Sequence, residues 1–117
     1  MFAHIWRMRA RRKKTEEYEE FGRQVTLQAL QKIEGCQQAY FVKVFEARKP
    51  EYFWVVLWRD AEALEAARSS PVWRDQKKKF EAGKFSKTIP LELECECLAS
   101  FARPPARAAK KKAGRKR

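Results

Sequence analysis

Hydrophobic and polar residues alternate at the start of the chain. In FAHIWRMRA, residues 2–10, one face of an extended chain would carry Phe2, His4, Trp6, Met8 and Ala10. The opposite face would carry Ala3, Ile5, Arg7 and Arg9. A period of two is typical of a β-strand, so this segment predicts a strand with two different faces.

A helical spacing replaces the alternation after residue 14. Thr15 can cap a helix, and Glu16 and Glu17 then lie near the positive end of the helix dipole. Gly22 interrupts this helix at a cost of about 1 kcal/mol, and Gly35 can end it in a left-handed conformation. Apolar residues recur at the helical period at Tyr18, Phe21, Val25, Ala29 and Ile33.

Two apolar segments, 39–47 and 51–60, predict a hairpin, because Pro50 between them cannot continue a ladder of hydrogen bonds. The part from Phe53 to Trp58 is apolar on both faces. A sheet with one face in water needs only one apolar face, so both faces of this strand require cover. This pattern is a first indication of a partner chain.

The last third of the body returns to a helix and then a strand. Asp60 is a typical helix cap, and Ser70 followed by Pro71 starts a second helical segment, so this helix is broken in two. In residues 90–101, an apolar row alternates with an acidic row, which predicts a strand with one acidic face. The two rows are Leu91, Leu93, Cys95 and Cys97, and Glu92, Glu94 and Glu96.

The resulting order β-α-β-β-α-β predicts the α+β class, with a ferredoxin-like four-stranded antiparallel sheet. The first and last strands are neighbours in that sheet. We therefore expect the acidic row of the last strand to lie beside Arg7 and Arg9. We interpret these glutamates as a structural ion ladder rather than as acid–base catalysts.

Composition and charge divide the 117 residues into a body and a tail. The formal net charge is +12, and the 44% hydrophobic content is typical of one globular domain, which we place at residues 1–102. Residues 103–117, RPPARAAKKKAGRKR, hold eight basic residues and neither an acidic nor an aromatic one. Such a segment cannot bury enough apolar surface to offset its ordering entropy, so we predict a disordered basic tail.

Several classes of site are disfavoured by what the sequence lacks. It has no apolar run of about eighteen residues and no signal-peptide core, so we expect a cytoplasmic protein without membrane contact. Cys95 and Cys97 would lie two apart on one strand, where disulfide geometry is poor, so we expect them and Cys36 to be buried free thiols. A single histidine, His4, leaves too few ligands for a zinc site, and we predict no metal.

Four segments together resemble the antibiotic biosynthesis monooxygenase domain of the dimeric α/β-barrel group: FAHIWRMRAR, KIEGCQQAYFVKV, YFWVVLWRDAEALEA and SSPVW. The resemblance covers nearly all of residues 2–100. It implies a homodimer whose two sheets form a barrel, which would cover the second apolar face of the 53–58 strand. It also implies oxidation of electron-rich phenols or quinols by molecular oxygen, with no cofactor.

The same resemblance argues against one branch of the group. Haem-degrading members use an asparagine on the first strand, with a tryptophan and a histidine on the second helix. By spacing against SSPVW, these positions fall on Trp6, Ala67 and Gln76. All three residues differ from that pattern, so we reject haem degradation for this chain.

The candidate site follows from the face that His4 and Trp6 share. His4 is the only histidine of the sequence, and the ordinary histidine pKa of about 6.5 suits a base that takes a phenolic proton. A flat aromatic or hydrophobic ligand would bind among aromatic rings. The candidate binding residues are Trp6, Tyr40, Phe45, Trp54, Trp58 and Trp73. Each of these rings could instead belong to the core, and His4 could be a purely structural, hydrogen-bonded histidine.

Two other functions remain open at this stage. A dimer that binds or senses a ligand without turnover would have the same sequence features. A nucleic-acid module is the other alternative, since the basic tail could neutralise phosphates nonspecifically and RNA-recognition domains share the ferredoxin-like sheet. The glycine-aromatic signature of those domains is absent from AYFVKVF and YFWVVLW. Basic runs are also commonly just solvated surface.

Overall fold

Four strands form one antiparallel sheet in the order β2-β3-β1-β4. The computed structural model describes residues 1–46 and 48–104. The strands are β1 (Phe2–Arg9), β2 (Cys36–Lys43), β3 (Glu51–Trp58) and β4 (Leu91–Glu96). The helices are α1 (Thr15–Phe21), α2 (Leu27–Gln31), α3 (Ala61–Arg68) and α4 (Pro71–Gly83). This arrangement confirms the ferredoxin-like α+β fold, with β1 beside β4.

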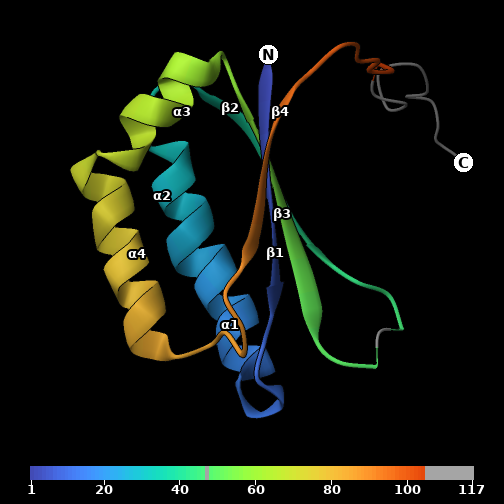
Figure 1. Cartoon of the computed structure of the whole chain (residues 1–117), viewed down its shortest axis with the longest axis vertical. Helices are drawn as coiled ribbons and strands as arrows, with labels where there is room; N and C mark the ends of the chain where they lie inside the picture. Colours follow the sequence, from blue (N-terminus) through green and yellow to red (C-terminus); the bar gives the residue numbers. More distant parts are fainter. Residues whose placement is uncertain (47, 105–117) are drawn as a thin grey trace, which may run out of the picture.

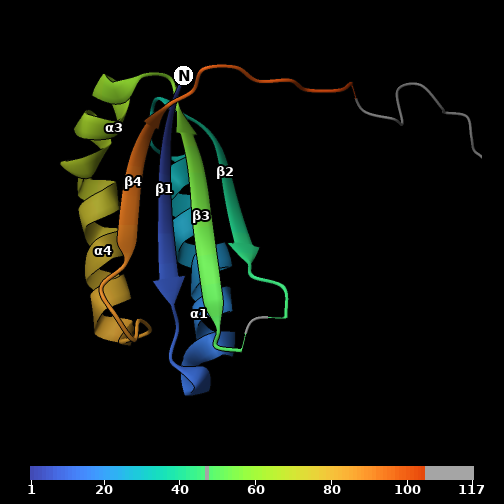
Figure 2. The same cartoon turned by 45° about the vertical axis from the view of Figure 1, so that its right-hand side comes forward.

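All helices cover the same face of the sheet. Figure 1 shows α2, α3 and α4 on one side of the strands, while the other side is bare. Figure 2 shows the sheet from its bare side, with the helices behind it and β1 between β3 and β4. The predicted basic tail falls on residues 103–117, of which 105–117 lie outside the described residues.

The register of β1 and β3 explains how one strand serves two faces. Phe2 lies opposite Trp58, His4 opposite Val56 and Trp6 opposite Trp54. Along β3, residues on the helix-covered face are buried and those between them are half-buried. The two-faced first strand predicted from the alternation is therefore confirmed.

The prediction for the acidic row of β4 was wrong. Glu92 lies opposite Trp6 and Glu94 opposite His4, so the glutamates share the helix-covered face. Arg7 lies opposite Leu91 on the bare face. Because side chains alternate with a period of two, a shift of one residue exchanges the faces of a whole strand. The arginines instead share the Glu51 carboxylate, which lies 3.4 Å from Nε of both Arg7 and Arg9.

Helix ends were predicted with mixed success. The carboxylate of Asp60 accepts a hydrogen bond from the Ala63 backbone N–H at 2.8 Å, and the Ser70 hydroxyl accepts one from the Trp73 N–H at 3.2 Å. Gly35 has a φ of +92° in the turn before β2, as a glycine there permits. Thr15 was wrongly assigned as a cap, because it is the first residue of α1 and makes no capping bond.

The first helical region changes its geometry at Gly22, where the sequence predicted an interruption, and continues to Gln31. Between α1 and α2, the segment Gly22–Thr26 forms a π-helical turn. A Cβ at Gly22 would lie 2.4 Å from a ring carbon of Phe41, so this glycine lets the helix approach the sheet closely. Turns of this kind are often found at functional sites, and Thr26 is the buried polar residue of this one.

The bare face of the sheet carries an apolar surface that nothing in the described chain covers. Tyr40 and Val42 of β2 and Leu91 and Leu93 of β4 are between 45% and 52% exposed. Between them, the register places Ile5 beside Val55. We call the row Ile5, Tyr40, Val42, Val55, Leu91 and Leu93 the bare-face patch. The sequence of residues 53–58, which is apolar on both faces, had indicated a second apolar surface of this kind.

Three smaller findings bear on the sequence-based expectations. All three cysteines are free, but they are half-buried rather than buried. Within residues 1–46 and 48–104, no helix is long and apolar enough to cross a membrane. The same residues contain no cluster of three or more His, Cys, Asp or Glu side chains arranged to hold a metal ion.

Candidate functional site

A cavity of about 430 Å³ lies between the helix-covered face of the sheet and the helices. The sheet contributes His4 and Trp6 from β1, Trp54 and Trp58 from β3, and Glu92 from β4. The helices contribute apolar, polar and basic side chains, mainly from α3 and α4. This volume is in the range of small-molecule sites, and the mixture of many apolar with few polar groups is typical of them.

The aromatic wall of the cavity is built around Trp6. Its ring is nearly parallel to that of Trp54, with centroids 5.6 Å apart, and meets Trp73 of α4 edge-on at 6.0 Å. Trp54 is stacked in turn on Phe41 at 4.4 Å, which fixes its orientation. These contacts hold the rings rigid before any ligand arrives. A flat aromatic ligand would therefore meet a preformed surface.

His4 is a buried titratable group in the cavity wall. Its side chain is 8% exposed, and its Nε2 lies 2.8 Å from a carboxylate oxygen of Glu92. A carboxylate can only accept a hydrogen bond, so Nε2 carries the hydrogen and Nδ1 of the neutral ring keeps its lone pair. The ring is also held against Trp6, with centroids 4.9 Å apart. His4 is thus held in one orientation by its contacts with Glu92 and Trp6.

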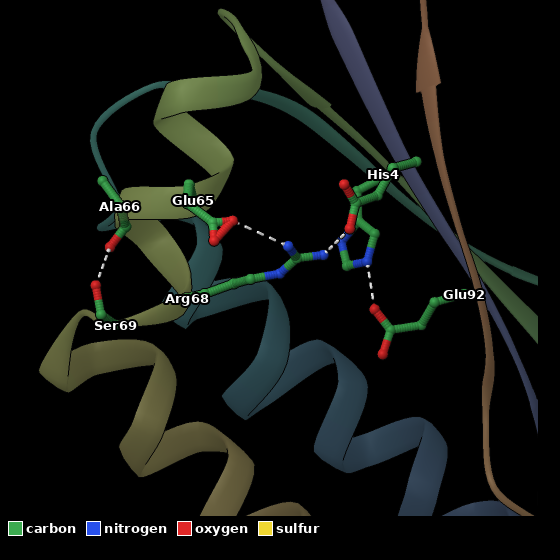
Figure 3. Close-up of polar contacts among 7 residues, drawn as sticks. His4, Glu65, Ala66, Arg68, Ser69 and Glu92 are labelled. Carbon is green, nitrogen blue, oxygen red and sulfur yellow. Dashed lines mark hydrogen bonds and ion pairs between the residues drawn. The ribbon is translucent and has the colours of Figure 1, made fainter.

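Arg68 connects α3 to the acidic row of β4. Its guanidinium donates to Glu65 at 3.2 Å and also to Glu94. Figure 3 shows the Arg68 side chain reaching from α3 to a carboxylate beside His4, while Glu92 contacts the imidazole. The hydrogen bond from Arg68 lowers the pKa of the Glu94 carboxyl, and the same bond raises the pKa of Arg68. Arg68 therefore stays charged and neutralises Glu94 beside His4.

The π-helical turn supplies a second polar contact in the wall. Thr26 donates its hydroxyl hydrogen to Oε1 of Gln76 on α4 at 2.6 Å, and both side chains are buried. This bond fixes the carboxamide so that its nitrogen end is left as a donor for a ligand. Tyr18 accepts from Nε1 of Trp54 at 3.1 Å, and burial raises the pKa of its phenol to about 12. Tyr18 is therefore a neutral structural group near pH 7.

The cavity brings together His4, Trp6, Trp54, Trp58 and Trp73, five of the residues singled out in the sequence. The other two candidates lie elsewhere. Tyr40 is half exposed on the bare face, opposite Val55, and Phe45 is 88% exposed after the end of β2.

Sequence reasoning found His4 but missed several other polar residues of the cavity. These are Glu92, which was assigned to an ion ladder, Arg68, Gln76, and the basic pair Arg74 and Lys77 of α4. The comparison with haem-degrading proteins did identify one of them, Gln76, as a position of interest. Trp6, Ala67 and Gln76, the positions matched to that branch, all line the cavity.

Comparisons with known proteins agree on the fold. A single-residue variant of SnoaB, a cofactor-independent oxygenase from Streptomyces nogalater, is 14% identical with a TM-score of 0.69, over 87% of this chain and 97% of that one. A structure from Deinococcus radiodurans that is named for the antibiotic biosynthesis monooxygenases is 10% identical with a TM-score of 0.73, over 90% and 100%. A Nitrosomonas europaea protein of unknown function is 12% identical with a TM-score of 0.68, over 89% and 95%.

At these identities the structural similarities establish the fold alone. No curated protein matches the sequence. The family model described as antibiotic biosynthesis monooxygenase matches residues 1–79, which span β1 through most of α4 and include every cavity residue named above except Glu92. The chain therefore belongs to the antibiotic biosynthesis monooxygenase family.

Proposed function

We propose that this protein is a cofactor-independent monooxygenase that acts on an electron-rich phenol or quinol. The observation that carries the proposal is the His4–Glu92 pair in the wall of a cavity lined by tryptophan rings. A base with one free nitrogen, a carboxylate behind it and a flat apolar surface beside it are the groups that such a reaction requires.

The chemistry needs only the substrate and molecular oxygen. Nδ1 of His4 takes the proton of the substrate hydroxyl, and Glu92 stabilises the imidazolium that forms. The electron-rich anion then reduces oxygen, and a C–O bond forms at the activated carbon. For an anthrone-type methylene the hydroxyl is that of its enol tautomer; addition of oxygen to the carbon, loss of the second hydrogen and cleavage of the O–O bond then give R₂CH₂ + O₂ → R₂C=O + H₂O. Oxygen is the oxidant, and His4 returns the proton to the departing water.

Oxygen uptake by the full-length, metal-free protein tests this function. The substrates would be a panel of anthrones, hydroquinones and catechols. We expect uptake with at least one compound, and His4→Ala should slow it roughly 10²- to 10⁴-fold, the usual contribution of a general base. Glu92→Gln should slow it less, because the amide still holds the ring.

Glu96→Gln is the matched control, since Glu96 lies on the same face of β4 but outside the cavity lining. It should leave uptake unchanged. Binding of the panel compounds without any uptake would contradict the oxygenase function and would favour a non-catalytic ligand-binding role.

The bare-face patch supports a homodimer as the working state of the protein. It is apolar, it extends across all four strands, and the family resemblance implies a second sheet packed against it. A second copy would close two sheets into a barrel without altering the cavity, which lies on the opposite face. Sedimentation equilibrium should then give twice the chain mass of 13.9 kDa. A monomer at micromolar concentration would contradict this.

A further inference from the structure

The polar part of the cavity lining has an excess of positive charge. Arg68, Arg74 and Lys77 line it together with a single carboxylate, Glu92. Arg74, Lys77 and Glu92 are also exposed, so they mark the side on which the cavity meets solvent. We call this side the mouth of the cavity. Its charge cannot be explained by the proposed oxidation, which needs only the base and the aromatic wall.

The three cations differ in what they already contact. Arg68 is bound to Glu65 and Glu94, so its charge is neutralised within the fold. Neither Arg74 nor Lys77 has an acidic side chain within ion-pair distance in the described part of the chain. On the same helix, Lys79 does have such a partner, since its Nζ lies 3.2 Å from Asp75. The two cations at the mouth are thus available to a ligand.

Helix geometry places Arg74 and Lys77 together. Residues three apart lie one above the other on a helix, with Cβ atoms about 5–6 Å apart. Trp73, whose ring meets Trp6 edge-on, lies four residues before Lys77 and therefore on the same side of α4. An anionic group held by these two cations would therefore lie beside the aromatic wall.

We infer that the ligand of this cavity is an aromatic carboxylic acid. Its ring lies against Trp6 and Trp73, its carboxylate binds Arg74 and Lys77, and its hydroxyl points toward His4. A guanidinium matches a carboxylate with two parallel hydrogen bonds, and the ammonium of Lys77 adds a third. The inference rests on the proposed function in one respect, namely that an aromatic hydroxyl compound occupies the cavity.

Calorimetric titration of the full-length protein with two probes tests the inference. The probes are 6-hydroxy-2-naphthoic acid and 2-naphthol, which share a ring system and hydroxyl but differ in the carboxylate. At pH 7 and physiological salt, we expect the acid to bind roughly tenfold to a hundredfold more tightly, the usual range for charge-assisted hydrogen bonds. The double variant Arg74→Gln, Lys77→Gln should remove this preference, because it weakens binding of the acid far more than binding of 2-naphthol.

The control is Lys78→Gln, which removes one charge from the same helix at an exposed residue outside the cavity lining. It should keep the preference for the acid. Equal affinity of the wild type for the two probes would overturn the inference and leave the oxygenase proposal standing, as would an equal loss in Lys78→Gln and in the double variant. Failure of both probes to bind would overturn both proposals.

Discussion

The two faces of the sheet are built from the same strands but differ in how far their side chains are buried. On the helix-covered face, Trp54, Val56 and Trp58 are at most 2% exposed, while on the bare face Leu91 and Leu93 remain about half exposed. Both faces carry apolar side chains, but the cavity on the covered face combines tryptophan rings with an imidazole, an amide and charged groups, whereas the bare-face patch holds none of these. The cavity thus differs from the bare-face patch in its polar groups rather than in its hydrophobicity.

The helix-covered face has two halves, a packed half and a half that contains the cavity. Toward one end, Tyr18, Tyr52, Phe80 and Phe85 pack ring against ring, with Tyr18 within 5.0–6.3 Å of each of the others. Trp54 connects this cluster to the cavity, since its Nε1 donates to Tyr18 while its ring stacks on Trp6. The packed half therefore supports the wall of the cavity.

The largest difference between the faces should appear in the free energy of unfolding. Trp54→Ala removes a ring that is 1% exposed and should cost about 3–5 kcal/mol in urea unfolding. Val55→Ala, the adjacent residue on the bare face, should cost about 1 kcal/mol or less when measured at a concentration low enough for monomers. Similar losses for both variants would mean that the two faces are equally buried in the isolated chain.

The second largest effect should be on association and should be confined to the bare face. Leu93 lies opposite Ile5 and is 52% exposed, so Leu93→Arg should leave the isolated chain folded. In a dimer the same arginine would be buried without a partner, a change that costs about 3 kcal/mol or more and weakens association at least a hundredfold. Sedimentation velocity measures this loss. An unchanged dimer would show that the copies associate elsewhere, and Glu96→Gln serves as the control on the opposite face.

The exchange of faces on β4 shows what the sequence could predict about the fold and what it could not. Alternation alone establishes that Glu92, Glu94 and Glu96 share a face, and the element order places β4 beside β1. The choice of face depends on cross-strand register and on Arg68, which reaches Glu94 from a helix 26 residues earlier in the chain. Pairing Leu91 and Leu93 with the apolar Ile5 side would have given the correct answer.

The part of the site that lies on strands could be predicted from the sequence. His4 and Trp6 share a face by their spacing, and the tryptophans of β3 follow from the register with β1. The helix residues Gln76, Arg74 and Lys77 could not be placed, because the rotation of α4 about its axis depends on how Trp73 packs against Trp6. Tyr40 was included for its aromatic ring, although its position between Ala39 and Phe41 assigns it to the opposite face.

A smaller effect should follow from loosening the packed half. Tyr18→Phe removes the acceptor of the Trp54 indole N–H, and a buried donor left unpaired should cost about 1–2 kcal/mol at pH 7. The unfolded-state pKa of tyrosine is near 10, and burial raises the folded-state pKa of Tyr18 to about 12. Its contribution to stability is therefore complete below pH 10 and is lost as the pH rises toward 12.

Urea unfolding of the wild type and Tyr18→Phe between pH 8 and pH 12 measures this dependence. The variant should lose less stability over that interval. Tyr52, whose pKa is also raised, mainly by burial, remains in the variant and accounts for part of the residual loss. Parallel curves for the two proteins would contradict the assignment to Tyr18.

The smallest effect should come from the carboxylate at the edge of the packed half. Glu19 accepts a hydrogen bond from the Tyr52 hydroxyl at 2.8 Å and lies 2.9 Å from Nζ of Lys43. Hydrogen bonds from Lys43 and then from Tyr52 lower the pKa of this carboxyl. Its stabilising effect is therefore present above the unfolded-state pKa of about 4.3 and is lost as the pH falls through the lower, folded-state pKa.

Because Glu19 is partly exposed to solvent, Glu19→Gln should cost less than about 1 kcal/mol at pH 7. The difference from the wild type should shrink as the pH is lowered below about 4, since both side chains are then neutral. Glu20→Gln, at an exposed neighbouring position, should show neither the loss nor its pH dependence. A constant difference down to pH 2 would mean that Glu19 acts through its shape and packing rather than through its charge.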